Sequence, residues 1–118
     1  MAVVLIVDDA AFMRMRLAKI LTGNGYEVIE AANGAEAVAA YEKYRPDVVL
    51  MDITMPEMDG LEALRAIKAK FPDAKVIMCS ALGQESTVIE SIKSGAKDFI
   101  VKPFQPEVVL GAVRKQVG

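Results

Sequence analysis

The sequence predicts an α/β protein in which a doubly wound, parallel five-stranded sheet carries helices on both faces. Five short runs of apolar residues alternate with longer amphipathic stretches along the 118 residues. This alternation is typical of βα units, whose strands form a parallel sheet. The connecting segments are short, and no low-complexity stretch interrupts the series. We therefore expect a single domain over residues 1–118.

The first unit has the clearest pattern. Residues 3–7 (VVLIV) are continuously apolar and rich in β-branched side chains, which indicates a strand buried on both faces. Residues 12–22 carry apolar side chains at helical spacing, and Gly23 follows directly. Because glycine commonly ends helices, we expect the first helix to stop there.

The second unit begins with a weaker strand over residues 27–31. Asn33 followed by Glu36 resembles a capping box, in which each residue satisfies a backbone N–H group of the first helical turn. The helix should run to about Tyr44, because Pro46 then breaks it.

The alternation continues through three further units. Apolar runs predict strands over 48–51, 76–79 and 99–101. Amphipathic stretches predict a helix ended by Pro72, a helix ended by Gly95 and a last helix that begins at Pro106.

Composition excludes several classes of function. Fourteen basic and sixteen acidic residues give a net charge of −2, so no basic surplus marks a nucleic-acid-binding protein. No stretch approaches the roughly 20 apolar residues that a membrane span needs. The single Cys79 cannot form an internal disulfide, which fits a reducing compartment. We expect a monomeric cytoplasmic protein that binds neither nucleic acid nor membrane.

Polar residues follow four of the five predicted strands. Asp8 and Asp9 follow the first, Asp52 the third, Ser80 the fourth and Lys102 the fifth. Ligands of such sheets bind at the carboxyl ends of the strands, where these side chains should meet.

Three carboxylates at one edge repel one another unless a cation lies between them. All-oxygen ligands suit Mg²⁺, which is commonly held by one or two carboxylates together with phosphate oxygens. Lys102 can reach an oxyanion as a point charge, and the Ser80 hydroxyl can donate to the same group. A carboxylate nucleophile such as Asp52, a metal and a cation together indicate phosphoryl transfer through an aspartyl-phosphate.

Each residue alone also has a structural interpretation. An acidic pair after a strand is often a helix N-cap, and an aspartate such as Asp52 is common in turns. Arg14, Arg16 and Lys19 are expected on the solvated face of the first helix, with kinase docking as the functional alternative. Only the joint placement at four strand ends is specific to a site. A mononucleotide binder of the same architecture would instead carry a Gly-rich phosphate loop after the first strand.

Three motifs resemble the response-regulator receiver family of two-component signalling. They are VDD at residues 7–9, MDITMPEMDG at residues 51–60 and IVKPF at residues 100–104. The resemblance covers the whole chain in the family's order. It implies a flavodoxin-like (βα)5 fold with strand order 2-1-3-4-5.

The resemblance also implies roles for individual residues. Asp52 would be the phosphoacceptor. Asp9, Asp52 and the backbone carbonyl of Thr54 would bind Mg²⁺ directly, with Asp8 acting through a water molecule, and Mn²⁺ could substitute. Lys102 would pair with Asp52 or its phosphoryl group.

The resemblance further implies that the bond between Lys102 and Pro103 is cis. Ser80 fills the position of the switch hydroxyl, where Thr is commoner, and Phe99 that of the switch aromatic residue. Because well-known chemotaxis members carry Tyr at this last position, a hydrogen bond from a phenol to a partner has no counterpart here.

Within the family, the chain is most similar to stand-alone chemotaxis regulators, through residues 10–14 and 96–106. This similarity implies phosphorylation by a histidine kinase of the chemotaxis type and docking on a flagellar motor switch protein or another output protein, with a phosphatase as a further partner. The chain would be a signalling switch that assists its own phosphoryl transfer and dephosphorylation, not an enzyme. A receiver domain excised from a larger response regulator is the alternative.

Overall fold

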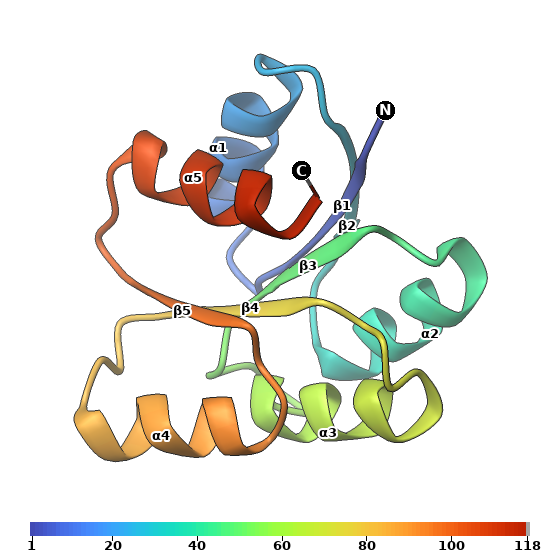
Figure 1. Cartoon of the computed structure of the whole chain (residues 1–118), viewed down its shortest axis with the longest axis vertical. Helices are drawn as coiled ribbons and strands as arrows, with labels where there is room; N and C mark the ends of the chain where they lie inside the picture. The colour runs from blue at the N-terminus through green and yellow to red at the C-terminus, as the bar shows by residue number, and fades with distance from the viewer. Residues whose placement is uncertain (118) are drawn as a thin grey trace.

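The computed structural model describes residues 1–117, in which strands and helices alternate strictly (Figure 1). The elements are β1 (Val3–Val7), α1 (Ala11–Thr22), β2 (Glu27–Ala31), α2 (Gly34–Tyr44), β3 (Val48–Met51), α3 (Gly60–Lys70), β4 (Val76–Ser80), α4 (Glu85–Lys93), β5 (Asp98–Val101) and α5 (Pro106–Val117). Each predicted strand is present, and each differs from its predicted bounds by at most one residue.

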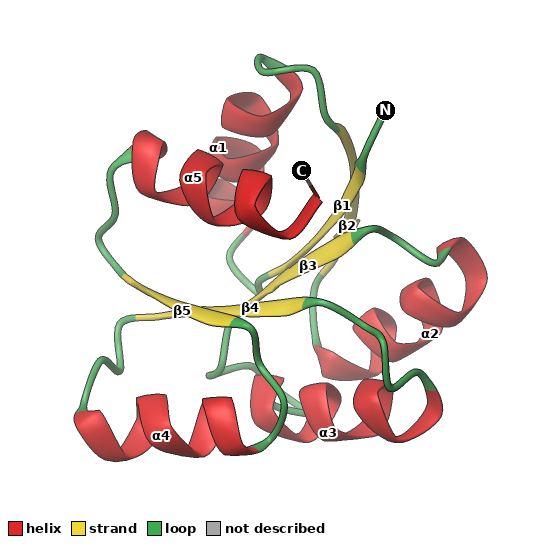
Figure 2. Ribbon diagram, viewed as in Figure 1, coloured by secondary structure: helices red, strands yellow, loops and turns green. Residues whose placement is uncertain are grey.

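The five strands form one parallel sheet in the order β2-β1-β3-β4-β5, which confirms the predicted topology (Figure 2). The register brings the last residues of neighbouring strands level. Val7 pairs with both Ala31 and Met51, and Ser80 pairs with Val101. The residues that follow the strands therefore emerge along one edge.

Helices cover both faces of the sheet. Figure 1 shows α1 and α5 on one face and α2, α3 and α4 on the other. Successive residues of β1 divide between the two cores: Val4 and Ile6 join the cluster under α1 and α5, while Leu5 and Val7 join the cluster over α2 and α3. All four are at most 1% exposed, which explains why the strand lacks polar alternation.

The start of α2 is capped as its sequence predicts. The Asn33 side chain accepts the Glu36 N–H at 2.9 Å, and Glu36 accepts the Ala32 N–H at 3.0 Å. The first bond satisfies an N–H group of the first helical turn, and the second reaches Ala32, one residue before the N-cap Asn33. Among residues 1–117, no helix has the length and apolar character needed to cross a bilayer.

Candidate functional site

Three carboxylates gather at the carboxyl edge of the sheet. Asp8 and Asp9 directly follow β1, and Asp52 directly follows β3, the neighbouring strand. Each offers one oxygen, and these oxygens all lie within 4.8 Å of one another. Asp8 and Asp52 are buried, whereas Asp9 is exposed, so the cluster opens to solvent on the side of Asp9.

Lys102 extends from the loop after β5 into this cluster. Its Nζ lies 2.7 Å from Asp8 Oδ2 and 3.5 Å from Asp52 Oδ1. The pairing with Asp52 that the family resemblance implied is present, and the contact with Asp8 is the shorter of the two. The bond between Lys102 and Pro103 is cis.

The pKa of Asp52 is raised above its ordinary value. Burial is the main cause because it disfavours the charged form, and the negative charges of Asp8 and Asp9 add to it. The charge of Lys102 and the Ile53 N–H, which donates to Asp52 Oδ1 at 2.9 Å, act in the opposite direction. Without a cation the site therefore holds more negative charge than its surroundings favour.

The pKa of Lys102 is also raised. Burial alone would lower it, but the hydrogen bond to Asp8 and the charges of Asp52 and Asp8 outweigh that effect. Lys102 is consequently a stable positive charge at the centre of the site.

Ser80 is the last residue of β4, whereas Phe99, which was expected at the end of its strand, is the second residue of β5 and lies two residues back from that edge. The Ser80 side chain is buried, and its Oγ accepts the Leu82 N–H at 3.0 Å, so the hydroxyl hydrogen is available to donate. Phe99 in β5 pairs with Met78 in β4 and is half-buried against the core over α2 and α3. Thr54 lies two residues after Asp52, in the exposed part of the following loop.

Glycines hold the loop that follows Asp52 close to the rest of the fold. A Cβ at Gly60 would overlap the carbonyl oxygen of Asp52, and one at Gly34 would overlap that of Met58. The Gly34 N–H donates to this Met58 oxygen at 3.0 Å, and the Gly60 N–H donates to Ile53 at 2.7 Å. Sequence reasoning missed both positions, although a glycine at the first residue of each of two helices was a signal that backbones approach there.

The donor set of the cluster suits a hard divalent cation. Three carboxylates within reach of one another supply the all-oxygen, negatively charged environment that Mg²⁺ prefers. The raised pKa of Asp52 identifies an electrostatic cost that such an ion would relieve. The residues therefore fit the ion, and Lys102 adds a cation that can face an oxyanion.

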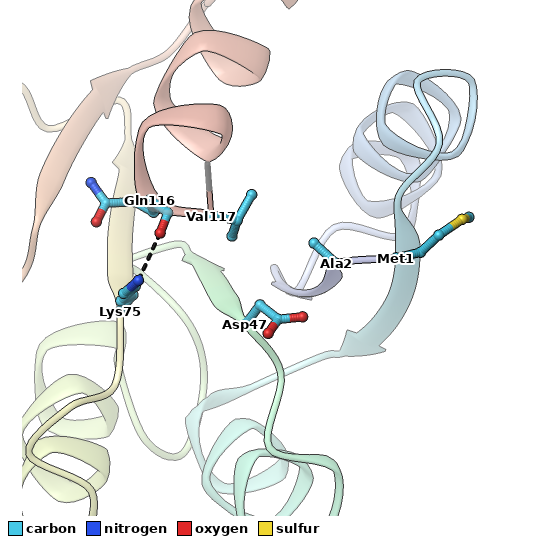
Figure 3. A pocket seen from close by; sticks show the side chains of 6 residues that line it. All are labelled: Met1, Ala2, Asp47, Lys75, Gln116 and Val117. Carbon is cyan, nitrogen blue, oxygen red and sulfur yellow. Dashed lines mark hydrogen bonds between the residues drawn. The ribbon is translucent and has the colours of Figure 1, made fainter.

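A separate recess of about 350 Å³ lies at the opposite edge of the sheet (Figure 3). It is lined by Met1, Ala2, Asp47, Lys75, Gln116 and Val117. The polar groups there have structural partners: Lys75 Nζ donates to the Gln116 carbonyl at 2.7 Å, and Asp47 accepts the Val3 N–H at 2.7 Å. The recess therefore contributes nothing to the chemistry of the carboxylates.

Comparison with known proteins agrees with this geometry. A family model described as the response regulator receiver domain matches residues 4–114. Two chemotaxis proteins CheY align over 113 residues, which is 95% of this chain and 94% of each relative. The one from Thermotoga maritima is 62% identical and the one from Bacillus subtilis 61%.

A solved structure extends the likeness to three dimensions. The chain is similar to one in the crystal structure of the CheX–CheY–BeF3–Mg²⁺ complex from Borrelia burgdorferi, with a TM-score of 0.95 and 43% identity. The match covers 99% of this chain and 90% of the other. With the strand order, the edge cluster and the family model in agreement, the chain belongs to the response regulator receiver family.

Proposed function

We propose that residues 1–118 form one receiver domain that accepts a phosphoryl group on Asp52 from a histidine kinase. The meeting of three carboxylates and Lys102 at one edge of the sheet carries this proposal. It combines a nucleophile, a place for a divalent cation and a fixed positive charge, which are the parts that phosphoryl transfer needs. Phosphorylation is general in the family.

In this proposal Asp9 and Asp52 bind Mg²⁺ directly, as does the backbone carbonyl of Thr54, and Asp8 acts through a water molecule. Mn²⁺ could substitute because it also accepts oxygen ligands. When bound, the ion supplies positive charge that offsets the carboxylates and attracts phosphate oxygens. The Mg²⁺ and BeF3 in the complex of the Borrelia CheY support this assignment.

The side chains of this chain would do the rest. An oxygen of Asp52 bonds to phosphorus as the bond between phosphorus and the donor breaks, and the donor atom leaves with that electron pair. The ion pair of Lys102 with Asp8 keeps the ammonium group beside the cluster, where it can face the oxygens of the transferred group. Asp52 already accepts the Ile53 N–H through Oδ1, which fixes the orientation of its carboxylate.

Ser80 and Phe99 would report the phosphorylated state. A phosphoryl oxygen is a stronger acceptor than the present surroundings offer, so the Ser80 hydroxyl would turn toward it and alter the β4–α4 loop. Phe99, which lies beside Met78 two residues back from Ser80, would then shift its packing, which is a population shift of a two-state element. The domain is thus a signalling switch that assists its own phosphorylation and dephosphorylation rather than an enzyme.

The chemotaxis relatives support a role as a chemotaxis messenger. We propose a kinase of the chemotaxis type as the donor, a flagellar motor switch protein as the output partner and a phosphatase as a further partner. The Borrelia relative was crystallised with CheX, which supports a regulatory partner of this kind. A monomer in the cytoplasm fits this role, as does the free, buried thiol of Cys79.

Intact-mass measurement after incubation with a small phosphodonor tests the proposal. With Mg²⁺, the wild-type chain should gain the mass of one phosphoryl group, while Asp52→Asn and the chelator-treated wild type should gain none. Glu107→Gln, an exposed carboxylate at the start of α5, is the control and should label like the wild type. Undiminished labelling of Asp52→Asn would exclude this nucleophile.

A further inference from the structure

Arg14 connects the end of β2 to the loop after β1. Its Nη1 donates to the carbonyl oxygen of Asp8 at 2.6 Å, and its Nε donates to Glu30 Oε1 at 3.2 Å. Its side chain is only 19% exposed. The sequence pattern assigned Arg14 to the solvated face of the first helix, but the structure turns it inward because two acceptors from other segments lie within its reach.

The peptide that Arg14 holds is the one that leads into Asp9. A peptide group is planar, so fixing the Asp8 carbonyl also fixes the N–H of Asp9 and limits the directions its side chain can take. The Asp8 carboxylate is held separately, since Oδ1 accepts the Ala10 N–H at 2.9 Å and Oδ2 pairs with Lys102. Asp9 is exposed and makes no side-chain hydrogen bond with the part of the chain that the structure describes. Its placement therefore depends on its backbone.

We propose that Arg14 is a positioning residue for the cation site, which holds the Asp8–Asp9 peptide so that the Asp9 carboxylate stays beside Asp52. This inference rests on the proposed function, in which that site binds Mg²⁺. The three carboxylates lie within 4.8 Å and repel one another, and Asp9 is the exposed member that can turn away. Without the guanidinium the loop relaxes outward, and cation binding must order it again.

The charge of Arg14 alone would have the opposite effect. A guanidinium next to a carboxylate cluster competes electrostatically with an incoming cation, so removing it should tighten Mg²⁺ binding on Coulombic grounds. A positioning role predicts weaker binding. The direction of the change in affinity therefore distinguishes the two roles.

The test measures the Mg²⁺ dissociation constant by calorimetry and the melting temperature without metal for each variant. Arg14→Gln should weaken Mg²⁺ binding by about tenfold, as is typical for groups that orient metal ligands. Arg14→Lys should also weaken it, because a point charge cannot hold Asp8 and Glu30 in the fixed geometry of a guanidinium. Lys19→Gln removes the same charge from an exposed site on the same helix and should leave the affinity within about twofold of the wild type.

The melting temperature without metal separates positioning from simple structural support. A stability loss alone, with the Mg²⁺ affinity unchanged or tighter in Arg14→Gln, overturns the inference. If neither Arg14 variant folds, Glu30→Ala serves as the test, because it leaves Arg14 in place and removes its second anchor. Losing a carboxylate also weakens cation binding on Coulombic grounds, so the control is Glu27→Ala, which removes the same charge from an exposed site on the same strand. Glu30→Ala should bind Mg²⁺ more weakly than Glu27→Ala, and equal affinity in the two variants would overturn the inference. A wild-type protein that binds no Mg²⁺ overturns the proposed function and this inference with it.

Discussion

The burial of Asp52 makes the stability of the fold depend on pH. Its pKa in the folded chain is raised above the unfolded value, mainly by burial. The folded state therefore holds the proton more tightly than the unfolded state does. Stability falls as the pH rises from the unfolded pKa of about 4 through the folded pKa, and the loss persists above it.

Asp52→Asn should consequently be more stable than the wild type at about pH 7 when no metal is present. The advantage should shrink as the pH falls and vanish below about pH 4, where Asp52 is protonated in both states. Thermal melting in the presence of a chelator across this range measures the effect. An advantage that is constant with pH would mean that it does not arise from the ionisation of Asp52.

Ser80→Ala tests the link between the site and Phe99. Beryllofluoride with Mg²⁺, used as a phosphoryl mimic, should still bind the variant at Asp52, because the carboxylates and Lys102 are unchanged. The accompanying change in the NMR signals of the Phe99 ring should be reduced severalfold, since the alanine offers no hydroxyl to the mimic. Ser80→Thr, which keeps a hydroxyl, should preserve the change in the Phe99 signals. Equal changes in the wild type and Ser80→Ala would show that the signal leaves the site by another route.

At this scale the sequence predicted which side chains meet but not how they pair. Strand ends brought Asp8, Asp52 and Lys102 together, yet the closer partner of Lys102 is Asp8. Such preferences depend on side-chain rotamers and on differences of less than 1 Å, which no spacing rule contains. The inward turn of Arg14 was missed for the same reason, because its acceptors come from two other segments.

At the scale of elements, apolar runs predicted the strands well, because strands buried on both faces leave a continuous signal. Helix α4 buries less of its apolar face than its amphipathic sequence suggests. Ile89 and Ile92 are 45% and 49% exposed, and Ser91 is its one buried residue. The helix lies beside β5, the edge strand, so less of the sheet is available to cover its apolar side chains. Helical spacing identifies an apolar stripe, but it does not show how much of that stripe an edge strand can bury.

Substituting alanine for two helical glycines should change the stability of the fold in opposite directions. Gly111 in α5 is exposed and has open space where a Cβ would lie, so Gly111→Ala should stabilise the fold by about 0.5 to 1 kcal/mol. Gly60→Ala places a Cβ on the Asp52 carbonyl and should destabilise it by about 2 to 3 kcal/mol. Urea denaturation measures both values. A Gly60→Ala chain as stable as the wild type would mean that the loop after Asp52 can yield.

At the scale of the whole molecule, the site exists because the register aligns the ends of separate strands. Asp8 and Asp52 lie more than 40 residues apart in sequence, and Lys102 a further 50, yet they meet because β1, β3, β4 and β5 pair in order. Strand order could not be deduced from periodicity alone, since several orders satisfy the same alternation of strands and helices. It followed from the family resemblance, and the structure confirms it.

Cation binding should accordingly stabilise the fold as a whole, because only the folded chain brings the ligands together. A ligand at 100 times its dissociation constant adds about 2.7 kcal/mol, which corresponds to a rise of roughly 10 °C for a domain of this size. Asp9→Ala should lose most of this rise, yet its metal-free form should be at least as stable as the wild type, since one of three repelling carboxylates is gone.

Asp73→Ala removes an exposed carboxylate from the loop before β4, at the opposite edge of the sheet, and should keep the full rise. Thermal melting with and without Mg²⁺ at constant ionic strength measures all three chains. A wild-type melting temperature that does not respond to Mg²⁺ would contradict a cation site at this edge.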